Sequence, residues 1–186
     1  MNKSQENRYI MEKFEVNTTA KGTGIITTSK VRKGEVFHRI TNYKIVKKPT
    51  YTSVQIDVEA HIEEPILGKL NHSCNPNLIV NTKTLECVAA RDIEPYEEVN
   101  FFYPSTEWEM DQPFICMCGS PQCMGIVAGA KYLSLNILSL QFINHHIRHK
   151  ALSCLEAKVF KNDVFVETRN SLKVETDTLS LSVTKA

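Results

Sequence analysis

The chain lacks both long apolar segments and an excess of charge of one sign. Its 22 lysines and arginines are balanced by 21 aspartates and glutamates, which leaves a formal net charge of +1. A general attraction to nucleic acid or to anionic membranes needs a larger positive balance. No apolar run approaches the roughly 18 residues that cross a bilayer, and residues 1–7 are polar, without the apolar core of a signal peptide. We therefore expect a soluble, intracellular protein, cytoplasmic or nuclear, that contacts neither nucleic acid nor membranes directly.

Internal repeats, low-complexity linkers and a regular alternation of strands with helices are also missing. The 186 residues, 42% of them hydrophobic, are enough for one main domain and a small appendage. Turn residues separate short β-prone segments, which predicts strands at residues 25–28, 41–46, 53–58, 78–80, 85–89 and 98–103. Apolar residues recur every three or four positions over residues 130–155, which predicts one amphipathic helix. We expect a mostly-β fold with this helix near its end and a hairpin at residues 159–166.

The cysteines are few but unevenly placed. Cys116, Cys118 and Cys123 lie close together, and this spacing suits thiolate metal ligands in a reducing compartment better than disulfides. Structural zinc takes four thiolate or imidazole ligands in tetrahedral geometry, of which these three are candidates. The alternative is a set of reduced surface thiols, or one disulfide with a spare thiol. Cys87 and Cys154 stand apart, and we expect them to be ordinary buried thiols.

Three short blocks follow one another along the chain. They are Asn71-His72-Ser73-Cys74-Asn75-Pro76-Asn77, then Glu98-Val99-Asn100-Phe101-Phe102-Tyr103, then the cysteine group. In this order they resemble the SET-domain protein lysine methyltransferases, as a small stand-alone member with a post-SET zinc-binding tail. The resemblance covers residues 14–133. It implies a β-clip-like fold of short strands around a knot-like core, with residues 8–107 as the SET domain, 108–133 as the post-SET region and 134–186 as a C-terminal helical extension and tail.

The resemblance also implies a cofactor, S-adenosyl-L-methionine. Its binding residues would be Lys21-Gly22-Thr23-Gly24, where the backbone approaches the ligand, together with Asn71, His72 and Tyr103. Asn71 and His72 bring an amide and an imidazole, which can orient a polar ligand. Each of these residues also has an ordinary role, since glycines shape turns, asparagine caps them and a histidine can simply be buried. In the family, the cysteine of the Asn-His-x-Cys block closes the zinc site, which makes Cys74 the fourth ligand.

The proposed chemistry is methyl transfer to a lysine side chain. A lysine ammonium, with a free pKa of about 10.4, must lose its proton before it can attack. The family pattern assigns Tyr103 to orient the lysine nitrogen and the methyl group, against the alternative of a core tyrosine at a strand end. Phe101 stands where the family alternates Phe and Tyr, and Phe there would permit di- or trimethylation. Tyr51 is a candidate second wall of the lysine channel, or an ordinary packing residue.

The sequence departs from the family pattern at several points. Phe102 replaces the usual aspartate and Tyr96 stands where the family usually has Gly, so the turn before residue 98 can differ. Residues 78–97 are long enough for a β-hairpin between the first two blocks. Phe102 also keeps open a second interpretation, a catalytically inactive, zinc-stabilised SET-like module that binds a protein partner. A zinc-ribbon that binds nucleic acid is a poorer interpretation, because no basic stripe is present.

Other candidates are less specific. Trp108 and Phe114 are either part of a lid over the site or core residues, and His145 with His149 is either a metal pair or a solvated helix face. The expected partner is a protein or peptide with a target lysine, histone or otherwise.

Overall fold

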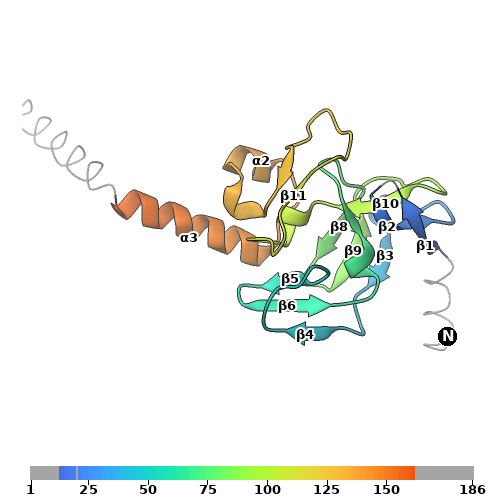
Figure 1. Ribbon diagram of the computed structural model, residues 1–186, viewed down its shortest axis with the longest axis horizontal. Helices are drawn as coiled ribbons and strands as arrows, with labels where there is room; N and C mark the ends of the chain where they lie inside the picture. Colours follow the sequence, from blue (N-terminus) through green and yellow to red (C-terminus); the bar gives the residue numbers. More distant parts are fainter. Residues whose placement is uncertain (1–12, 20, 162–186) are drawn as a thin grey trace, which may run out of the picture. The chain divides into compact units, whose positions relative to one another are not determined.

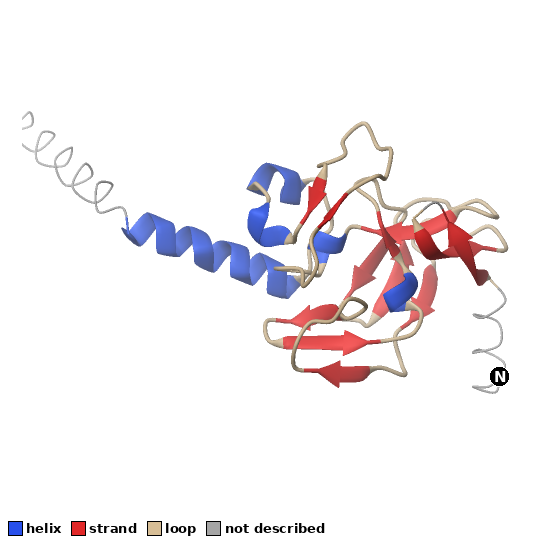
Figure 2. Ribbon diagram, viewed as in Figure 1, coloured by secondary structure: helices blue, strands red, loops and turns tan. Residues whose placement is uncertain are grey.

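A computed structural model describes residues 13–19 and 21–161 of the chain (Figure 1). These residues divide into two compact units, one ending at His149 and the other comprising the rest of the last helix up to Lys161. The first unit is mostly β, as predicted, and Figure 2 shows that strands dominate it. Within the described residues no helix is both long and apolar enough to cross a membrane.

The largest sheet has the strand order β1-β2-β10-β8-β9-β3, and β7 pairs with β10 off this path. Its strands are β1 (Phe14–Thr19), β2 (Gly22–Thr27), β3 (Val36–Arg39), β7 (Asn71–His72), β8 (Leu78–Asn81), β9 (Glu86–Ala89) and β10 (Glu98–Phe101). The predicted hairpin between the first two sequence blocks is confirmed as β8 and β9, in which Val80 pairs with Cys87.

Alternation along these strands builds the core. Leu78 and Val80 in β8 are buried, and the register places them opposite the buried Ala89 and Cys87 in β9. Val99 and Phe101 of β10 join the same cluster. Burying one such aliphatic or aromatic side chain stabilises the fold by about 1.5–3 kcal/mol. Cys87, which lies in this core, is a buried thiol, as expected.

Two smaller sheets complete the β structure. One has the order β4 (Lys44–Val46), β6 (Ala60–Glu63), β5 (Val54–Asp57), and the other joins β11 (Phe114–Ile115) to β12 (Ile126–Val127). Short 3-10 helices follow or separate the strands: η1 (Leu67–Lys69), η2 (Tyr103–Ser105) and η3 (Ala130–Tyr132). The η2 turn begins directly after β10 and carries Tyr103.

The prediction of one helix over residues 130–155 is wrong. The segment forms η3, then α2 (Leu135–Ser139), then α3 (His145–Lys161). The Ser134 side chain caps α2 by accepting a hydrogen bond from the Ile137 N–H, which begins a new helix inside the predicted one. The connector after α2 is held by side-chain bonds of Gln141 and Asn144 to the β core, and these tertiary contacts override the helical spacing.

Other C-terminal predictions also need correction. Residues 159–160 lie in α3 and so do not form a hairpin strand, while the second half of the predicted hairpin, residues 164–166, lies outside the described residues. Cys154 is exposed on α3, contrary to the expectation of a buried thiol. His145 and His149 are exposed with stacked rings 6.4 Å apart, as on a solvated helix face.

The turn before β10 has an unusual backbone. Tyr96 has φ +67°, a left-handed conformation that favours glycine, and its side chain is largely exposed. Its N–H donates to the Thr27 carbonyl at 2.8 Å, which fixes the turn against the end of β2. The glycine that the family usually has here therefore matches the backbone conformation that this chain also adopts.

We predict that Tyr96→Gly raises the free energy of unfolding by about 0.5–1 kcal/mol. The left-handed conformation costs a non-glycine residue about 1–2 kcal/mol, and the greater flexibility of unfolded glycine offsets part of that gain. Urea unfolding followed by circular dichroism measures the difference. Tyr96→Ala is the control, since it removes the same ring but keeps the backbone cost. A glycine variant no more stable than the alanine variant would contradict the explanation.

Candidate active site and cysteine cluster

Strand β10 brings the sequence blocks together. It pairs antiparallel with β2, through Val99 opposite Ile25, and parallel with β7, through Asn100 opposite Asn71 and Phe101 opposite His72. The Ser73 N–H donates to the Phe101 carbonyl at 3.1 Å, which continues this pairing. Asn71, His72 and the start of η2 are thus neighbours, although the β8–β9 hairpin lies between them in sequence.

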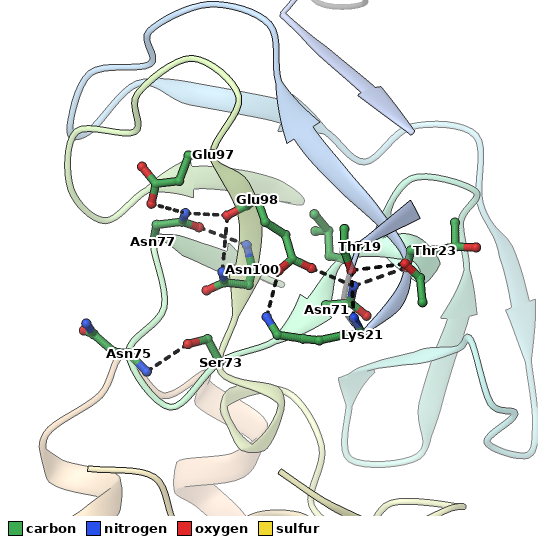
Figure 3. Close-up of polar contacts among 12 residues, drawn as sticks. Thr19, Lys21, Thr23, Asn71, Ser73, Asn75, Asn77, Glu97, Glu98 and Asn100 are labelled. Atoms are coloured by element: carbon green, nitrogen blue, oxygen red, sulfur yellow. Dashed lines mark hydrogen bonds and ion pairs between the residues drawn. The ribbon is translucent and has the colours of Figure 1, made fainter. Parts of the chain in front are cut away.

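Residues 21–24 meet Asn71 at one end of this arrangement (Figure 3). The Asn71 Nδ2 donates to the Thr23 carbonyl at 3.2 Å and to Glu98 Oε1 at 2.8 Å. The Lys21 Nζ donates to the other oxygen of Glu98 at 2.8 Å. A Cβ on Gly24 would lie 2.8 Å from Asn71 Nδ2 and 2.7 Å from Thr19 Cγ2, so a larger residue would displace these side chains. Gly22 has φ +102°, so it also shapes the turn.

Glu98 and Asn77 are two site residues that the sequence reading did not single out. Glu98 holds both Lys21 and Asn71, and the fully buried Asn77 donates from Nδ2 to the Glu98 carbonyl at 2.8 Å. The Asn77 Oδ1 also accepts the N–H of Asn100 at 2.9 Å (Figure 3). Both lie inside the sequence blocks, Asn77 at the last position of the first block and Glu98 at the first position of the second, so their place in the blocks was the available signal.

His72 stands between Tyr103 and the cysteines. Its ring is 4% exposed, and burial, with the charge of Lys21, lowers its pKa to about 4, so the imidazole is neutral at neutral pH. Its Nδ1 accepts the N–H of Tyr103 at 3.2 Å, and its Nε2 lies 3.3 Å from Cys74 Sγ. A neutral ring that accepts at Nδ1 carries its proton on Nε2, which therefore donates to the sulfur.

Tyr103 is the first residue of η2, and its hydroxyl donates to the Leu70 carbonyl at 2.8 Å. The centroid of its ring lies 4.8 Å from the ring centroid of Phe101 and 5.3 Å from that of His72. Burial raises the pKa of Tyr103 far above its usual range, and the charges of Tyr51, Glu107 and Glu98 act in the same direction. The phenol is therefore a neutral hydrogen-bond donor.

The other aromatic candidates fall into different environments. Phe101 is buried in the main core and packs on Tyr103, whereas the Tyr51 side chain is 81% exposed. Phe102 is buried, with its ring 5.8 Å from that of His72, so an apolar ring fills the place of the family's aspartate. Trp108 packs on a small cluster that includes Leu138 and Ile147, and so belongs to a core.

Phe114 and Glu107 lie near the tyrosine. The Phe114 ring is 6.0 Å from the rings of His72 and of Tyr103. Glu107 is a buried acid that the sequence reading missed, and its Oε1 accepts the N–H of Gln55 at 2.8 Å. Burial raises the pKa of Glu107 to about 7, although bonds from Gln55 and Thr106 favour its charged form. Near neutral pH this carboxyl is present in both forms.

All four predicted zinc ligands come together. The Sγ atoms of Cys74, Cys116, Cys118 and Cys123 lie within 4.8 Å of one another, and the Cys74–Cys116 pair is 3.8 Å apart. In a tetrahedral zinc site, with zinc–sulfur bonds of about 2.3 Å, the sulfurs are about 3.8 Å apart. All six cysteines are free thiols, so the alternative of a disulfide is not supported. The donor set fits one structural zinc ion.

Electrostatics within the cluster are uneven. Burial raises the pKa of Cys74 strongly and that of Cys116 to about 11. Burial also opposes ionisation of Cys118, but bonds from the backbone of Cys74 and Ser120 and from neighbouring thiols outweigh it and lower its pKa to about 6. A divalent cation favours the thiolate form of every ligand.

A pocket of about 400 Å³ opens beside the cysteine cluster. Its lining includes Cys74, Pro76, Phe102, Ser105 and Phe142. Residues 21–24, Asn71 and His72 do not line it, whereas Asn75, which Figure 3 also draws, does.

Comparison with known proteins shows which family and which relatives the chain is similar to. Residues 22–104 match the SET domain family. The chain is 41% identical over 120 residues to the methyltransferase flvH of Aspergillus flavus, covering 62% of this chain and 66% of that protein. It is 37% identical over 65 residues to a histone-lysine N-methyltransferase, H3 lysine-4 specific, of Emericella nidulans, covering 31% of this chain and 5% of that protein.

One solved structure supports the fold. The crystal structure of KRYPTONITE in complex with mCHG DNA and SAH superposes with a TM-score of 0.51 at 21% identity, over 61% of this chain and 28% of that one. Residues 22–104, which match the SET domain family, include β2, β7, β10 and the start of η2, the elements that assemble the candidate site. Residues 22–104 are therefore a SET domain, the chain spans less than two thirds of the length of these relatives, and the relatives are methyltransferases.

Proposed function

We propose that the chain is an S-adenosyl-L-methionine-dependent protein lysine N-methyltransferase with one structural zinc ion. The observation that carries this proposal is the parallel pairing of β7 with β10, which places Asn71 and His72 beside Tyr103. Residues from three distant parts of the chain thereby surround one small region, as a two-substrate reaction requires. The methyltransferase names of the curated relatives agree with it.

The proposed cofactor cradle consists of residues 21–24, Asn71, His72 and Tyr103. Gly24 has no Cβ, so its backbone can lie next to Asn71. Glu98 and Lys21 bring one negative and one positive charge to the same place. Such a pair can meet the ammonium and carboxylate of an amino-acid moiety. KRYPTONITE, which shares the fold, was solved with SAH, the product form of this cofactor. The cofactor would supply an activated methyl group.

The proposed lysine channel has mostly neutral walls. Tyr103 keeps its proton because its pKa is raised, and His72 is neutral because its pKa is lowered to about 4. Surroundings without a full negative charge favour the uncharged amine of a lysine over its ammonium form. In this proposal the Tyr103 hydroxyl orients the amine, the apolar ring of Phe101 leaves room for di- or trimethylation, and Tyr51 lines the entrance.

Zinc in this proposal has a structural role. It would join Cys74 of the Asn-His block to Cys116, Cys118 and Cys123 of the post-SET region, residues 108–133. Because Cys74 is only two residues after His72, the ion would fix the same segment that holds the cofactor. Residues 8–107 would form the SET domain and residues 134–186 an extension. The substrate would be a protein lysine, and the H3-specific relatives make histones the first candidates to test.

We predict that Tyr103→Phe lowers the methyl-transfer rate by about 10²-fold while cofactor affinity stays nearly unchanged. The variant removes the hydroxyl that would position the amine, together with its bond to the Leu70 carbonyl, while the ring still packs on Phe101 and His72. Radiolabelled methyl transfer into purified core histones and into a whole lysate measures the rate, and calorimetry measures the affinity.

Tyr132→Phe is the matched control, because this tyrosine is exposed and its hydroxyl bonds Glu109 at the surface. Full activity in the Tyr103 variant would exclude the proposed role of its hydroxyl. No measurable affinity of the unaltered protein for S-adenosylmethionine would favour the non-catalytic interaction module instead.

We also predict one zinc ion per chain, and that Cys118→Ser lowers both zinc content and cofactor affinity. Loss of one thiolate weakens the tetrahedral site, and Cys74 then no longer holds the Asn-His segment as firmly. Elemental analysis of the purified protein measures the metal. Cys154→Ser is the control, since that thiol is exposed and outside the cluster. Freshly purified protein without zinc would refute this part of the proposal.

A further inference from the structure

The connector between α2 and α3 holds a buried asparagine that none of the sequence blocks includes. Asn144 is 2% exposed and is the last residue before α3. Its Nδ2 donates to the carbonyls of Val80 and Ser105, each at 2.9 Å. Its Oδ1 accepts from the N–H of Thr82 at 2.9 Å and from the hydroxyl of Thr82 at 3.2 Å. Both amide hydrogens and both lone pairs are thus used, which fixes the orientation of the group.

These bonds hold the end of the turn that carries Tyr103. Ser105 is the last residue of η2, and its carbonyl also accepts the backbone N–H of Asn144 at 3.2 Å. The next carbonyl, that of Thr106, is 2.8 Å from the Nε2 of the buried His146. The start of η2 is held separately, because the Tyr103 N–H bonds His72 and its hydroxyl bonds Leu70. A single 3-10 turn has few internal bonds, so its position depends on these outer contacts.

The same connector reaches the cysteine cluster. The Gln141 Nε2 donates to the carbonyl of Cys74 at 3.3 Å. The connector therefore bonds the backbone of the Asn-His-x-Cys block and the backbone that follows Tyr103. It fixes the two segments against β8, because the Asn144 amide also donates to the Val80 carbonyl of that strand.

We propose that Asn144 is a positioning residue for Tyr103, acting through its paired bonds to Ser105 and Val80. This inference rests on the proposed methyl-transfer function for its kinetic consequence. A misplacement of about 1 Å at a reacting group can lower a rate by about 10²-fold, so a fixed η2 turn matters for the rate more than for cofactor binding. Residues 140–146 are then part of the catalytic framework of this chain, where the sequence alone indicated only a helical appendage.

The test uses Asn144→Asp in the full chain labelled with 3-fluorotyrosine. The chain has six tyrosines, and Tyr103→Phe assigns the fluorine resonance of Tyr103. At about pH 9 the new carboxylate faces two carbonyls and repels them. At about pH 6 a protonated carboxyl, favoured by burial, can replace one of the two lost donors. Spectra of the unaltered protein at each pH control for titration of His146. Asn136→Asp is the matched control variant, because Asn136 is an exposed asparagine of α2.

We expect the Tyr103 resonance of Asn144→Asp to shift or broaden at about pH 9 and to return toward its normal position at about pH 6. The rate of methyl transfer into core histones should fall about 10- to 100-fold at the higher pH, with the cofactor Kd changed less than about threefold. Asn136→Asp should change neither. Asn144→Leu, which removes all side-chain bonds, should show the Tyr103 change at both pH values.

An unchanged Tyr103 resonance in Asn144→Asp at both pH values would overturn the inference. Rate, affinity and melting temperature falling together at both pH values would also overturn it, because that pattern indicates a general structural role. The fluorine signal does not depend on activity. If the unaltered protein transfers no methyl group while the Tyr103 signal responds as expected, the proposed function fails and the positioning of Tyr103 by Asn144 stands.

Discussion

The two-residue parallel pairing of β7 with β10 is the contact on which the rest of the site depends. It sets Asn71 opposite Asn100 and His72 opposite Phe101, so that the chain after β10 turns at Tyr103 directly beside the imidazole. Without this pairing the Asn-His block and the tyrosine would belong to separate loops. The surrounding elements serve to hold it: β2 and β8 flank β10 in the sheet, and Asn77 bonds the β10 backbone.

His72 transmits this constraint in two directions. Its Nδ1 accepts a hydrogen bond from the Tyr103 N–H, and its Nε2 donates one to the sulfur of Cys74. This pair of bonds requires a neutral ring with its proton on Nε2. Burial keeps the ring neutral. A metal ion at the cysteines would therefore fix the position of His72 through a single hydrogen bond. The proposed zinc and the proposed catalytic tyrosine would then be separated by one imidazole.

The parts of this arrangement that the sequence predicted are local. The strands around residues 78–101 follow from short alternating segments between turns, and the four cysteines from close spacing plus the family pattern. The failures come from contacts between distant residues. The continuous helix was wrong because Asn144 bonds Val80 and Ser105, and Glu98 was missed because its partners Lys21 and Asn71 lie far away in sequence. Periodicity carries no information on such bonds.

In the proposed function, one segment, from Asn71 to Cys74, links the metal site to the cofactor site. The most direct measurement is the cadmium-113 resonance of cadmium-substituted protein, recorded before and after saturation with S-adenosylmethionine. Cadmium replaces zinc in thiolate sites, and its resonance reports the geometry of the four sulfurs. We expect one cadmium per chain and a resonance that moves when the cofactor binds. A bound cofactor that leaves the cadmium resonance unchanged would contradict the link.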